Sequence, residues 1–382
     1  MAVEWIHPKV LRIARNYRLV DRPDDRKLQR EPVPVLGGIA VAFGIFAGVM
    51  VALLSGMLTG GPIPSAGTAL FVSMVVMLFV GAIDDMMDLS AAFRFFIQIV
   101  VTLSLIYGSG ICIDSLHGLW GVGEYSWQVA VPLTVFASVG VINAINMIDG
   151  VNGLCSSLCL IYNLLFGCVF VSSGLYAVAL VNFVMAASLI PFLIHNVVGI
   201  RSKMFIGDSG TMVMGVLMSY DTIVLLSKDS HMAWCQASEL YNGLVTLSVA
   251  ILAVPVADTL RVMTMRMVHG TSPFKADKTH LHHILMDYTH SHSITTTIEV
   301  LIALLIDATW LITYWLRTGM EWQFYAVLLV SMLLVWGLYA YLAVRRKVRT
   351  GMAWKLRCLF AQLRQGNTQW WMHLQELVDR KC

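Results

Sequence analysis

Three carboxylates lie within five residues of one another, at Asp84, Asp85 and Asp88, directly after an apolar run over residues 66–80. If this stretch is helical, Asp84 and Asp88 are i,i+4 neighbours on one face. Two carboxylates about 4 Å apart repel by roughly 4 kcal/mol at an effective dielectric constant near 20. A bound cation relieves such repulsion, and clustered oxygen ligands suit Mg²⁺ or Mn²⁺. A solvated acidic loop between two membrane helices is the alternative.

Two basic residues of the sequence, Arg94 and Lys27, could bind an anion. Arg94 lies where a membrane helix would meet the lipid surface, and could contact a lipid phosphate or simply extend into the interface. Lys27 belongs to a basic, proline-containing loop that ends in Gly37-Gly38 at the start of an apolar run. N–H groups at such a helix start can bind an anion. The plainer interpretation is a positively charged inner loop followed by a helix-start signal.

Amide and acid side chains recur every third residue at Asn143, Asn146 and Asp149, and Asn152 follows Gly150. This spacing places them along one stripe near a helix end. Polar residues inside a membrane are costly and mark functional sites by default. A ladder of amides that only joins neighbouring helices is the alternative.

An aspartate between small residues opens a further apolar run, in the sequence Gly207-Asp208-Ser209-Gly210. Aspartate is a favoured N-cap residue, so a purely structural role is a serious alternative. The basic Arg201 shortly before it is compatible with a phosphate- or metal-binding role.

Three histidines fall within four residues, at His280, His282 and His283, and Arg266 precedes them. The cluster invites a zinc interpretation, but no cysteine stands nearby and adjacent histidines do not easily share one tetrahedral ion. Mixed with basic residues, the histidines fit better as donors to phosphate or sugar oxygens. A solvated loop is the alternative.

The composition is that of a polytopic membrane protein. The 382 residues are 58% hydrophobic and 13% charged, with a mean hydropathy of +0.73, whereas soluble domains carry about 25% charged residues. Ten apolar segments can cross, or nearly cross, about 30 Å of hydrocarbon. They are residues 35–56, 66–83, 94–111, 127–145, 153–173, 175–195, 210–227, 241–262, 296–316 and 323–343. The sequence therefore predicts an all-α integral membrane protein with about ten transmembrane helices and no nucleic-acid partner.

The distribution of basic residues orients these segments. If the residues before 35 are cytoplasmic, the outer loops hold only Lys228 and Arg317 of the 26 Lys and Arg residues. Such asymmetry marks the cytoplasmic side. The same topology brings the polar stretches described above to the inner face. We therefore expect a cytoplasmic active site in a membrane domain over residues 1–343, followed by a basic, tryptophan-containing cytoplasmic tail over residues 344–382.

Together these motifs resemble the polyprenyl-phosphate N-acetylhexosamine-1-phosphate transferase family, glycosyltransferase family 4. The resemblance covers roughly residues 18–290, and its four motifs occur in the family's order. They are DDxxD (Asp84, Asp85, Asp88), NAxNxxDGxxGL (residues 143–154), FIGDSG (residues 205–210) and SPFxxDxxHxHH (residues 272–283). The family usually has a membrane helix before the basic loop, and residues 1–19 resemble only the inner end of that helix.

The resemblance implies a reaction in which undecaprenyl phosphate attacks the β-phosphorus of a UDP-N-acetylhexosamine, UMP leaves, and Mg²⁺, with Mn²⁺ as a substitute, binds the diphosphate. Phosphoryl transfer of this kind depends on positioning and charge neutralisation. The implied metal ligands are Asp208 and Asn146, and Asp84 or Asp85 would take a proton from the carrier phosphate or organise the metal. Asp88 and Asn143 would support them.

The remaining polar residues are implied to bind substrates. Asp149 and Asn152 would lie near the uracil, although bacterial members often have Asp where Asn152 stands. The other implied substrate-binding residues are Lys27, Arg94, Arg266, His280, His282 and His283.

The HxHH pattern resembles the branch that uses UDP-N-acetylglucosamine, and the reaction would begin a cell-envelope polysaccharide in a bacterial inner membrane, with the C-terminus in the cytoplasm. A phospho-N-acetylmuramoyl-pentapeptide transferase is the alternative within the family. A transporter of lipids or nucleotide sugars, using Asp258, Asp307 or Asp221, and a zinc hydrolase are alternatives outside it. A homodimer is one assembly state that the sequence leaves open.

Overall fold

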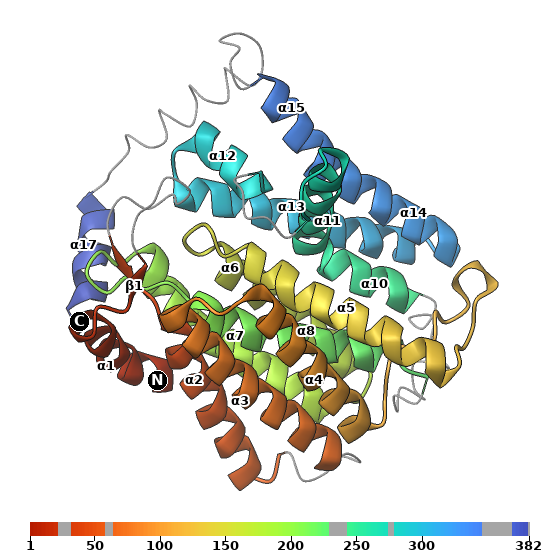
Figure 1. The fold of residues 1–382 in the computed structure, drawn as a ribbon, viewed down its shortest axis with the longest axis horizontal. Helices are drawn as coiled ribbons and strands as arrows, with labels where there is room; N and C mark the ends of the chain where they lie inside the picture. The colour runs from red at the N-terminus through yellow and green to blue at the C-terminus, as the bar shows by residue number, and fades with distance from the viewer. Residues whose placement is uncertain (22–31, 58–63, 229–242, 274–278, 346–368, 381–382) are drawn as a thin grey trace.

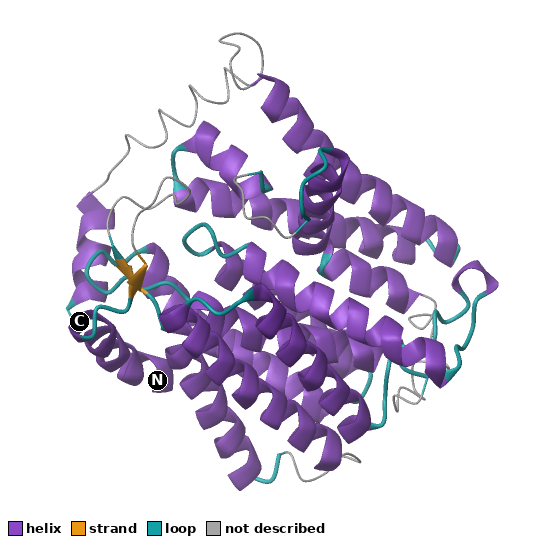
Figure 2. Cartoon of the chain, viewed as in Figure 1, coloured by secondary structure: helices purple, strands orange, loops and turns teal. Residues whose placement is uncertain are grey.

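The computed structural model is almost entirely helical, with one small two-stranded sheet (Figures 1 and 2). It describes all residues except 22–31, 58–63, 229–242, 274–278, 346–368 and 381–382. The first half of the chain forms α1 (Ala2–Asn16), β1 (Val20–Asp21), β2 (Val33–Pro34), α2 (Gly37–Leu54), α3 (Pro64–Met87), α4 (Ala91–Ser109), the short helix η1 (Leu119–Gly121), α5 (Trp127–Met147), α6 (Leu154–Ser172) and α7 (Tyr176–Val197). The second half forms α8 (Gly207–Leu226), α10 (Leu244–Ile251), α11 (Ala253–Val268), α12 (Leu281–Thr289), α13 (His292–Trp315), α14 (Met320–Ser331), the π-helical turn η3 (Met332–Gly337), α15 (Leu338–Arg345) and α17 (Gln369–Asp379).

Among the described residues, nine helices are long and apolar enough to cross a membrane, or ten if one bent pair counts as a single span. Each of the ten apolar segments of the sequence corresponds to one of them. The last span runs without a break through α14, η3 and α15. The prediction of an all-α polytopic membrane protein is confirmed.

The eighth apolar segment differs from its prediction. Residues 241–262 were expected to form one span, but the chain bends by 71° between α10 and α11, at Leu252. The hydropathy of a segment gives its apolar length but not the direction of its axis. A sharp bend changes that direction without changing the apolar length, so hydropathy does not detect it. Because of the bend, α11 and the histidine stretch after it do not continue along the axis of α10.

Helix α8 is the centre of the bundle, and almost all of its residues are buried. It packs against α2, α3, α5, α6 and α10. Small residues permit this close packing: a side-chain carbon on Gly81 of α3 would lie 2.5 Å from the Asp208 carbonyl oxygen, and one on Gly215 of α8 would lie 2.8 Å from Ile142 of α5. Close backbone approach through glycine is typical of membrane helix packing.

Backbone hydrogen bonds join the start of α2 to the segment before α8. The Phe205 N–H donates to the Pro34 carbonyl oxygen, and the N–H groups of Gly37 and Gly38 donate to the carbonyl oxygens of Phe205 and Ile206. These two amides are therefore not free to bind an anion, because both donors are used within the fold, and the plainer interpretation of a helix start fits this stretch. Instead they hold the residues that lead into α8.

The N-terminal helix α1 is amphipathic and packs against α2 and α7. Its buried face carries Val3, His7 and Leu11, whereas Trp5 and Ile13 are exposed. Buried and exposed positions that recur with helical spacing are typical of a helix lying along a surface. The interpretation of residues 1–19 as the inner end of a membrane span stays a prediction. The labels for the two chain ends lie close together in Figure 1, beside α1 and α17.

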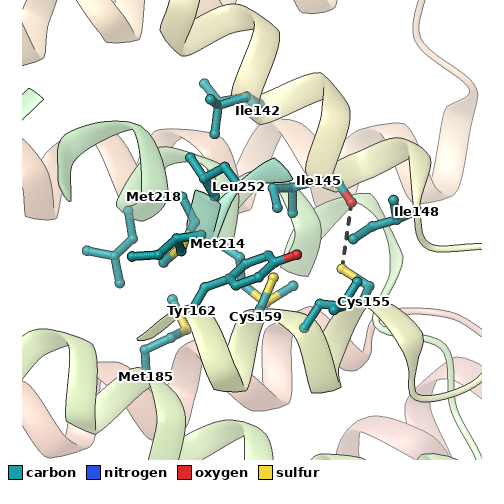
Figure 3. Close-up of a cluster of buried hydrophobic side chains, with 14 of the residues drawn as sticks. Ile142, Ile145, Ile148, Cys155, Cys159, Tyr162, Met185, Met214, Met218 and Leu252 are labelled. Carbon is teal, nitrogen blue, oxygen red and sulfur yellow. Dashed lines mark hydrogen bonds between the residues drawn. The ribbon is translucent and has the colours of Figure 1, made fainter. Parts of the chain in front are cut away.

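A buried cluster lies where α5, α6, α8 and the α10–α11 bend meet (Figure 3). Tyr162 and Cys159 of α6 pack with Met214 of α8 and Leu252 at the bend. The Cys155 thiol donates to the Ile145 carbonyl oxygen at 3.6 Å, near the end of α5. This apolar cluster fixes the ends of α5 and α6, and therefore the loop between them that carries Asp149 and Asn152.

Candidate active site

The carboxylate of Asp85, near the end of α3, caps the start of α8. It accepts hydrogen bonds from the backbone N–H groups of Asp208, at 2.7 Å, and Ser209, at 3.1 Å. The first turn of a helix leaves N–H groups without partners inside the helix, and a negative charge there is favourable. Gly207 is in the left-handed region, and a side-chain carbon on it would lie 2.6 Å from both Asp85 carboxylate oxygens. Asp208 therefore stands one residue inside the helix start and leaves the capping to Asp85.

Arg94, near the start of α4, lies between two further carboxylates. Its Nη1 atom is 2.8 Å from Asp84 Oδ2 and 3.7 Å from Asp208 Oδ2. Asp84 is buried, and its other oxygen accepts the Leu89 backbone N–H at 2.7 Å. One guanidinium thus brings carboxylates from α3 and α8 to a single point and balances part of their charge.

Asn146, in the last turn of α5, completes this cluster. Its amide nitrogen donates to Asp208 Oδ1 at 2.5 Å and to Thr211 Oγ1 at 2.8 Å. Asn143, one turn earlier, donates to Gln98 Oε1 of α4 at 2.6 Å and therefore ties α5 to α4 beside the site. We call Asp84, Asp85, Arg94, Asn146 and Asp208 the carboxylate cluster.

The carboxylate cluster has the donor chemistry of a magnesium site. Asp84, Asp208 and Asn146 offer oxygen atoms, and Mg²⁺ is typically held by one or two carboxylates while substrate phosphates and water supply the other ligands. The side chain of Asp208 is 31% exposed, so it can meet a ligand from outside. Among the described residues, no group of three or more His, Cys, Asp or Glu side chains is arranged to hold a metal ion by itself.

Asp88 does not share a helical stripe with Asp84. Helix α3 ends at Met87, and Asp88 follows in the left-handed region with φ +50°. Its side chain is exposed. The expectation of an i,i+4 pair is therefore wrong, because the helix ends one residue before the stripe would be complete.

The loop between α5 and α6 carries the next two predicted residues. Asp149 is near enough to Asp85 for the two negative charges to interact, and it accepts from the Gly207 N–H. Asn152 is buried, and its backbone N–H donates to His292 Nδ1 at 3.2 Å. The Asn152 carbonyl oxygen accepts from Thr296 at 2.9 Å. Asp149 thus lies beside the carboxylate cluster, whereas Asn152 is bonded to α13.

The histidine stretch is organised by Asp258, a buried carboxylate of α11. Its oxygens accept from the His280 imidazole at 2.8 Å, from the Leu281 N–H at 3.1 Å and from Arg261 Nη2 at 2.7 Å. The Arg261 guanidinium also lies 3.6 Å from the centre of the Tyr339 ring, a cation–π contact. This buried ion pair fixes the start of α12 and the orientation of His280.

His282 brings the histidine stretch against the α5–α6 loop. A side-chain carbon on Gly150 would lie 2.5 Å from His282 Nε2. Burial lowers the pKa of His282 well below its usual value, and the neighbouring His283 and His280 lower it further, so the imidazole is neutral at pH 7. The rings of His280 and His282 are nearly parallel, with centres 5.5 Å apart, and those of His282 and His283 are 4.4 Å apart. In the part of the chain that the structure describes, these histidines form no group of three or more side chains that could hold a metal ion.

Two predicted substrate-binding residues remain. Arg266 is buried and donates to the Pro273 carbonyl oxygen at 2.6 Å, so it orders the loop after α11. Lys27 lies outside the described residues.

Asp258 and Arg261 hold the histidine stretch in place, a role that the sequence interpretation missed. Asp258 drew attention only as a transporter residue, and Arg261 drew none. The available signal was a pair of opposite charges at i and i+3 inside an apolar segment, where unpaired charges are too costly to keep. Asp221, the other buried transporter candidate, is bonded to Asn182 at 3.0 Å, a contact between neighbouring helices.

The amino-acid sequence is similar to known transferases over most of its length. The sequence model of glycosyl transferase family 4 matches residues 67–226. The undecaprenyl-phosphate alpha-N-acetylglucosaminyl 1-phosphate transferase of Yersinia pestis is 31% identical over 85% of this chain and 84% of its own length. A probable undecaprenyl-phosphate N-acetylglucosaminyl 1-phosphate transferase of Bacillus subtilis is 32% identical, over 83% and 84%.

A third relative comes from another bacterial group. The decaprenyl-phosphate N-acetylglucosaminephosphotransferase of Mycolicibacterium smegmatis is 33% identical over 76% of this chain and 73% of its own length. The matched region contains the whole carboxylate cluster. The chain therefore belongs to glycosyl transferase family 4, as a membrane enzyme of the polyprenyl-phosphate N-acetylhexosamine-1-phosphate transferases.

Proposed function

We propose that this enzyme transfers N-acetylglucosamine-1-phosphate from UDP-N-acetylglucosamine to undecaprenyl phosphate and releases UMP, as the first step of a cell-envelope polysaccharide. The observation that carries the proposal is the meeting of α3, α4, α5 and α8 at the carboxylate cluster. The names of the relatives support the choice of sugar and carrier. The reaction joins two anionic substrates, so it needs charge balance and positioning more than covalent help.

The chain's own residues divide this work. Both oxygens of Asp85 are committed to backbone N–H groups, so Asp85 positions the start of α8 and does not act as a base. Asp84 and Asp208 face the Arg94 guanidinium, which can exchange them for a substrate phosphate. The carrier phosphate is largely ionised at pH 7, so orientation of its oxygen matters more than proton removal.

The carboxylate cluster fits a Mg²⁺ ion, with Asp208 and Asn146 as its ligands and Asp84 beside them. When bound, Mg²⁺ supplies neutralisation of the charge on the diphosphate, and Mn²⁺ accepts the same oxygen ligands. His282 lies against Gly150 of the α5–α6 loop, and the rings of His280 and His283 lie beside it, so the histidine stretch is next to this loop. This position supports a role for the stretch in binding the sugar or diphosphate.

We further propose that the enzyme lies in a bacterial plasma membrane with this site and its C-terminus in the cytoplasm. The positive-inside distribution of Lys and Arg supports this orientation. UDP-sugars are made in the cytoplasm, so the orientation also brings the site to its soluble substrate.

The direct test presents purified enzyme with undecaprenyl phosphate, Mg²⁺ and one UDP-sugar at a time. UDP-N-acetylglucosamine should give lipid-linked product and an equal amount of UMP, whereas UDP-N-acetylgalactosamine and UDP-N-acetylmuramoyl-pentapeptide should give at least about tenfold less, since a site built to bond a substrate hydroxyl rejects analogues that misplace it. Lipid product and UMP are measured by chromatography. Turnover of the pentapeptide substrate alone would move the enzyme to the other branch of the family, and UMP formation without lipid would contradict a transferase.

Asp149 should make stability depend on pH. Burial, together with the negative charge of Asp85, raises the pKa of Asp149 to about 7. Between the ordinary pKa of 3.8 and about 7, the folded protein therefore holds a proton that the unfolded chain has released, so the stability of the folded state falls as pH rises through this window. Asp149→Asn removes this penalty. The melting temperature of the variant minus that of the wild type should grow from pH 5 to pH 7.5 and then level off.

The matched control for this measurement is Asp88→Asn, which removes an exposed carboxylate from the same face. Its melting temperature should follow the wild-type curve. A difference for Asp149→Asn that stays constant with pH would show that this carboxyl titrates in its ordinary range.

A further inference from the structure

The C-terminal helix α17 is docked on the protein through one of its faces. The half-buried positions recur with helical spacing, whereas the positions between them are exposed, including Met372, Glu376 and Leu377. This face packs against α7, and Figure 1 shows α17 beside α1, at the edge of the bundle where the first and last helices lie. The half-buried residues of α17 are Trp371, Leu374, Gln375, Val378 and Asp379.

Asp379, the last residue of α17, binds a row of backbone donors. Its Oδ2 atom accepts from the N–H groups of Ile200, at 3.2 Å, and Arg201, at 3.0 Å. Its Oδ1 atom accepts from the Ser202 N–H at 2.9 Å and from the Ser202 hydroxyl at 2.7 Å. Successive N–H groups that point to one centre form an anion-binding concavity. One carboxylate therefore satisfies three consecutive backbone donors and a hydroxyl.

The environment is built around this contact. Partial burial alone would raise the pKa of Asp379, but the hydrogen bonds from Arg201, Ser202 and Ile200 outweigh it and hold the pKa below its usual value. A side-chain carbon on Gly199 would lie 3.3 Å from Asp379 Oδ1 and would clash with the Ser202 hydroxyl. The carboxylate thus stays ionised at neutral pH, in a space that a larger residue at position 199 would fill.

The loop that Asp379 binds, residues 198–206, is the connection that carries Asp208. It joins α7 to α8, and its backbone has a bonding partner at nearly every step. The His7 imidazole of α1 donates to the Ser202 carbonyl oxygen at 2.8 Å, and Arg15 of α1 donates to the Arg201 carbonyl oxygen. Asn196 of α7 donates to the Met204 carbonyl oxygen at 2.7 Å.

The far end of the same loop is bonded to the start of α2, through Phe205 and Ile206, directly before the helix start that Asp85 caps. A short, closely packed segment whose backbone is hydrogen-bonded at nearly every step transmits a displacement to its neighbours. Only five residues lie between Ser202 and Asp208. A shift at one end of the loop therefore reaches the carboxylate at the other.

We propose that α17 clamps the α7–α8 loop through Asp379 and thereby positions Asp208, so that Asp379 is a positioning residue for the transfer reaction. The proposal extends the proposed function to the C-terminal tail and, for its effect on turnover, rests on it. Asp379 touches no residue of the carboxylate cluster in the contacts described above, so its effect on turnover has to pass through the loop.

The test compares Asp379→Asn with Glu376→Gln in the full-length enzyme. Both substitutions remove one negative charge from α17, but Glu376 is exposed. Amide hydrogen exchange should accelerate in Asp379→Asn at residues 200–202 and also at residues 205–209. Its kcat should fall roughly 10- to 100-fold, as expected for a small displacement of a reacting group, with KM for UDP-N-acetylglucosamine nearly unchanged. Asp379→Glu should recover part of the lost kcat, and Glu376→Gln should match the wild type.

Exchange and turnover separate the two proposals. If exchange accelerates at residues 200–202 but not at 205–209, and kcat is unchanged, α17 docks without positioning the site and the inference is wrong. Unchanged exchange at 200–202 would show that Asp379 does not hold the loop at all. If the wild-type enzyme transfers no sugar phosphate, the proposed function is wrong. The difference in exchange between Asp379→Asn and the wild type at residues 205–209 would still decide whether α17 orders the start of α8.

Discussion

Asp208→Asn is expected to lower kcat about 10³-fold, a loss typical of removing one group that stabilises charge in a transition state. The side chains have the same shape, and the Asn146 amide that now donates to Asp208 Oδ1 can still donate to an amide oxygen. The fold and the membrane insertion should therefore survive. What the variant lacks is the negative charge beside Arg94 and the carboxylate that we assign to Mg²⁺. The measurement is UMP release at saturating substrates, together with thermal unfolding in detergent.

Asp88→Asn is the matched control for this loss. It removes the same charge from the same end of the bundle, but from an exposed residue beyond the end of α3. Its kcat should stay within about twofold of the wild type, since surface substitutions away from such sites have small effects. Near-normal turnover in Asp208→Asn would falsify the metal-ligand assignment, and a large loss in Asp88→Asn would show that the whole acidic stretch acts as a unit.

Asp85→Asn is expected to damage both stability and turnover, because Asp85 caps α8. An asparagine would turn an N–H₂ donor toward one of the two N–H donors that Asp85 now accepts. A buried donor without a partner costs about 1–3 kcal/mol, and loss of the negative charge at the helix start costs about 0.3–1 kcal/mol more. The melting temperature should fall, and kcat should fall about 10²-fold because Asp208 is displaced.

A glycine substitution tests the same contact from the other side. Gly207→Ala leaves every carboxylate in place, but its side-chain carbon would lie 2.6 Å from both Asp85 oxygens, at a backbone φ of +69°. It should therefore lower the melting temperature and kcat as we expect for Asp85→Asn. Gly67→Ala is the matched control, because position 67 of α3 has no atom within 4 Å of the added carbon. A fully active Gly207→Ala enzyme would contradict the capping role of Asp85.

The membrane architecture could be predicted from the sequence because hydrocarbon imposes a minimum apolar length on every span. All ten apolar segments became helices, from α2 to the span that ends in α15. The bend between α10 and α11 could not be predicted in this way, since the residues around Leu252 are apolar on both sides of it. Its direction depends on packing against α8, α13 and α14, which no local pattern reports.

The candidate site was predicted in part. Asp84, Asp208 and Asn146 were selected because they belong to polar motifs at the ends of apolar segments, and their roles were implied by the resemblance of those motifs to the family. The structure brings them together with Arg94. Their division of labour was not predictable. Whether Asp84 or Asp85 faces the ligand depends on which of the two adjacent side chains points to the start of α8, and that is decided by the rotation of α3 against α8.

The roles of Asp258 and Asp379 were even less predictable from the sequence. In the sequence, one is a charge in an apolar segment and the other a charge at the end of a tail. Only the fold shows that Asp258 holds His280 and that Asp379 holds the loop before Asp208. The sequence by itself determined the class of protein, the approximate number of spans and the residue types available for chemistry, because these follow from the transfer energies of single side chains and from the residue types themselves. The tertiary structure decided which carboxylate faces a ligand and which caps a helix, because hydrogen-bond partners far apart in the chain are chosen by helix packing.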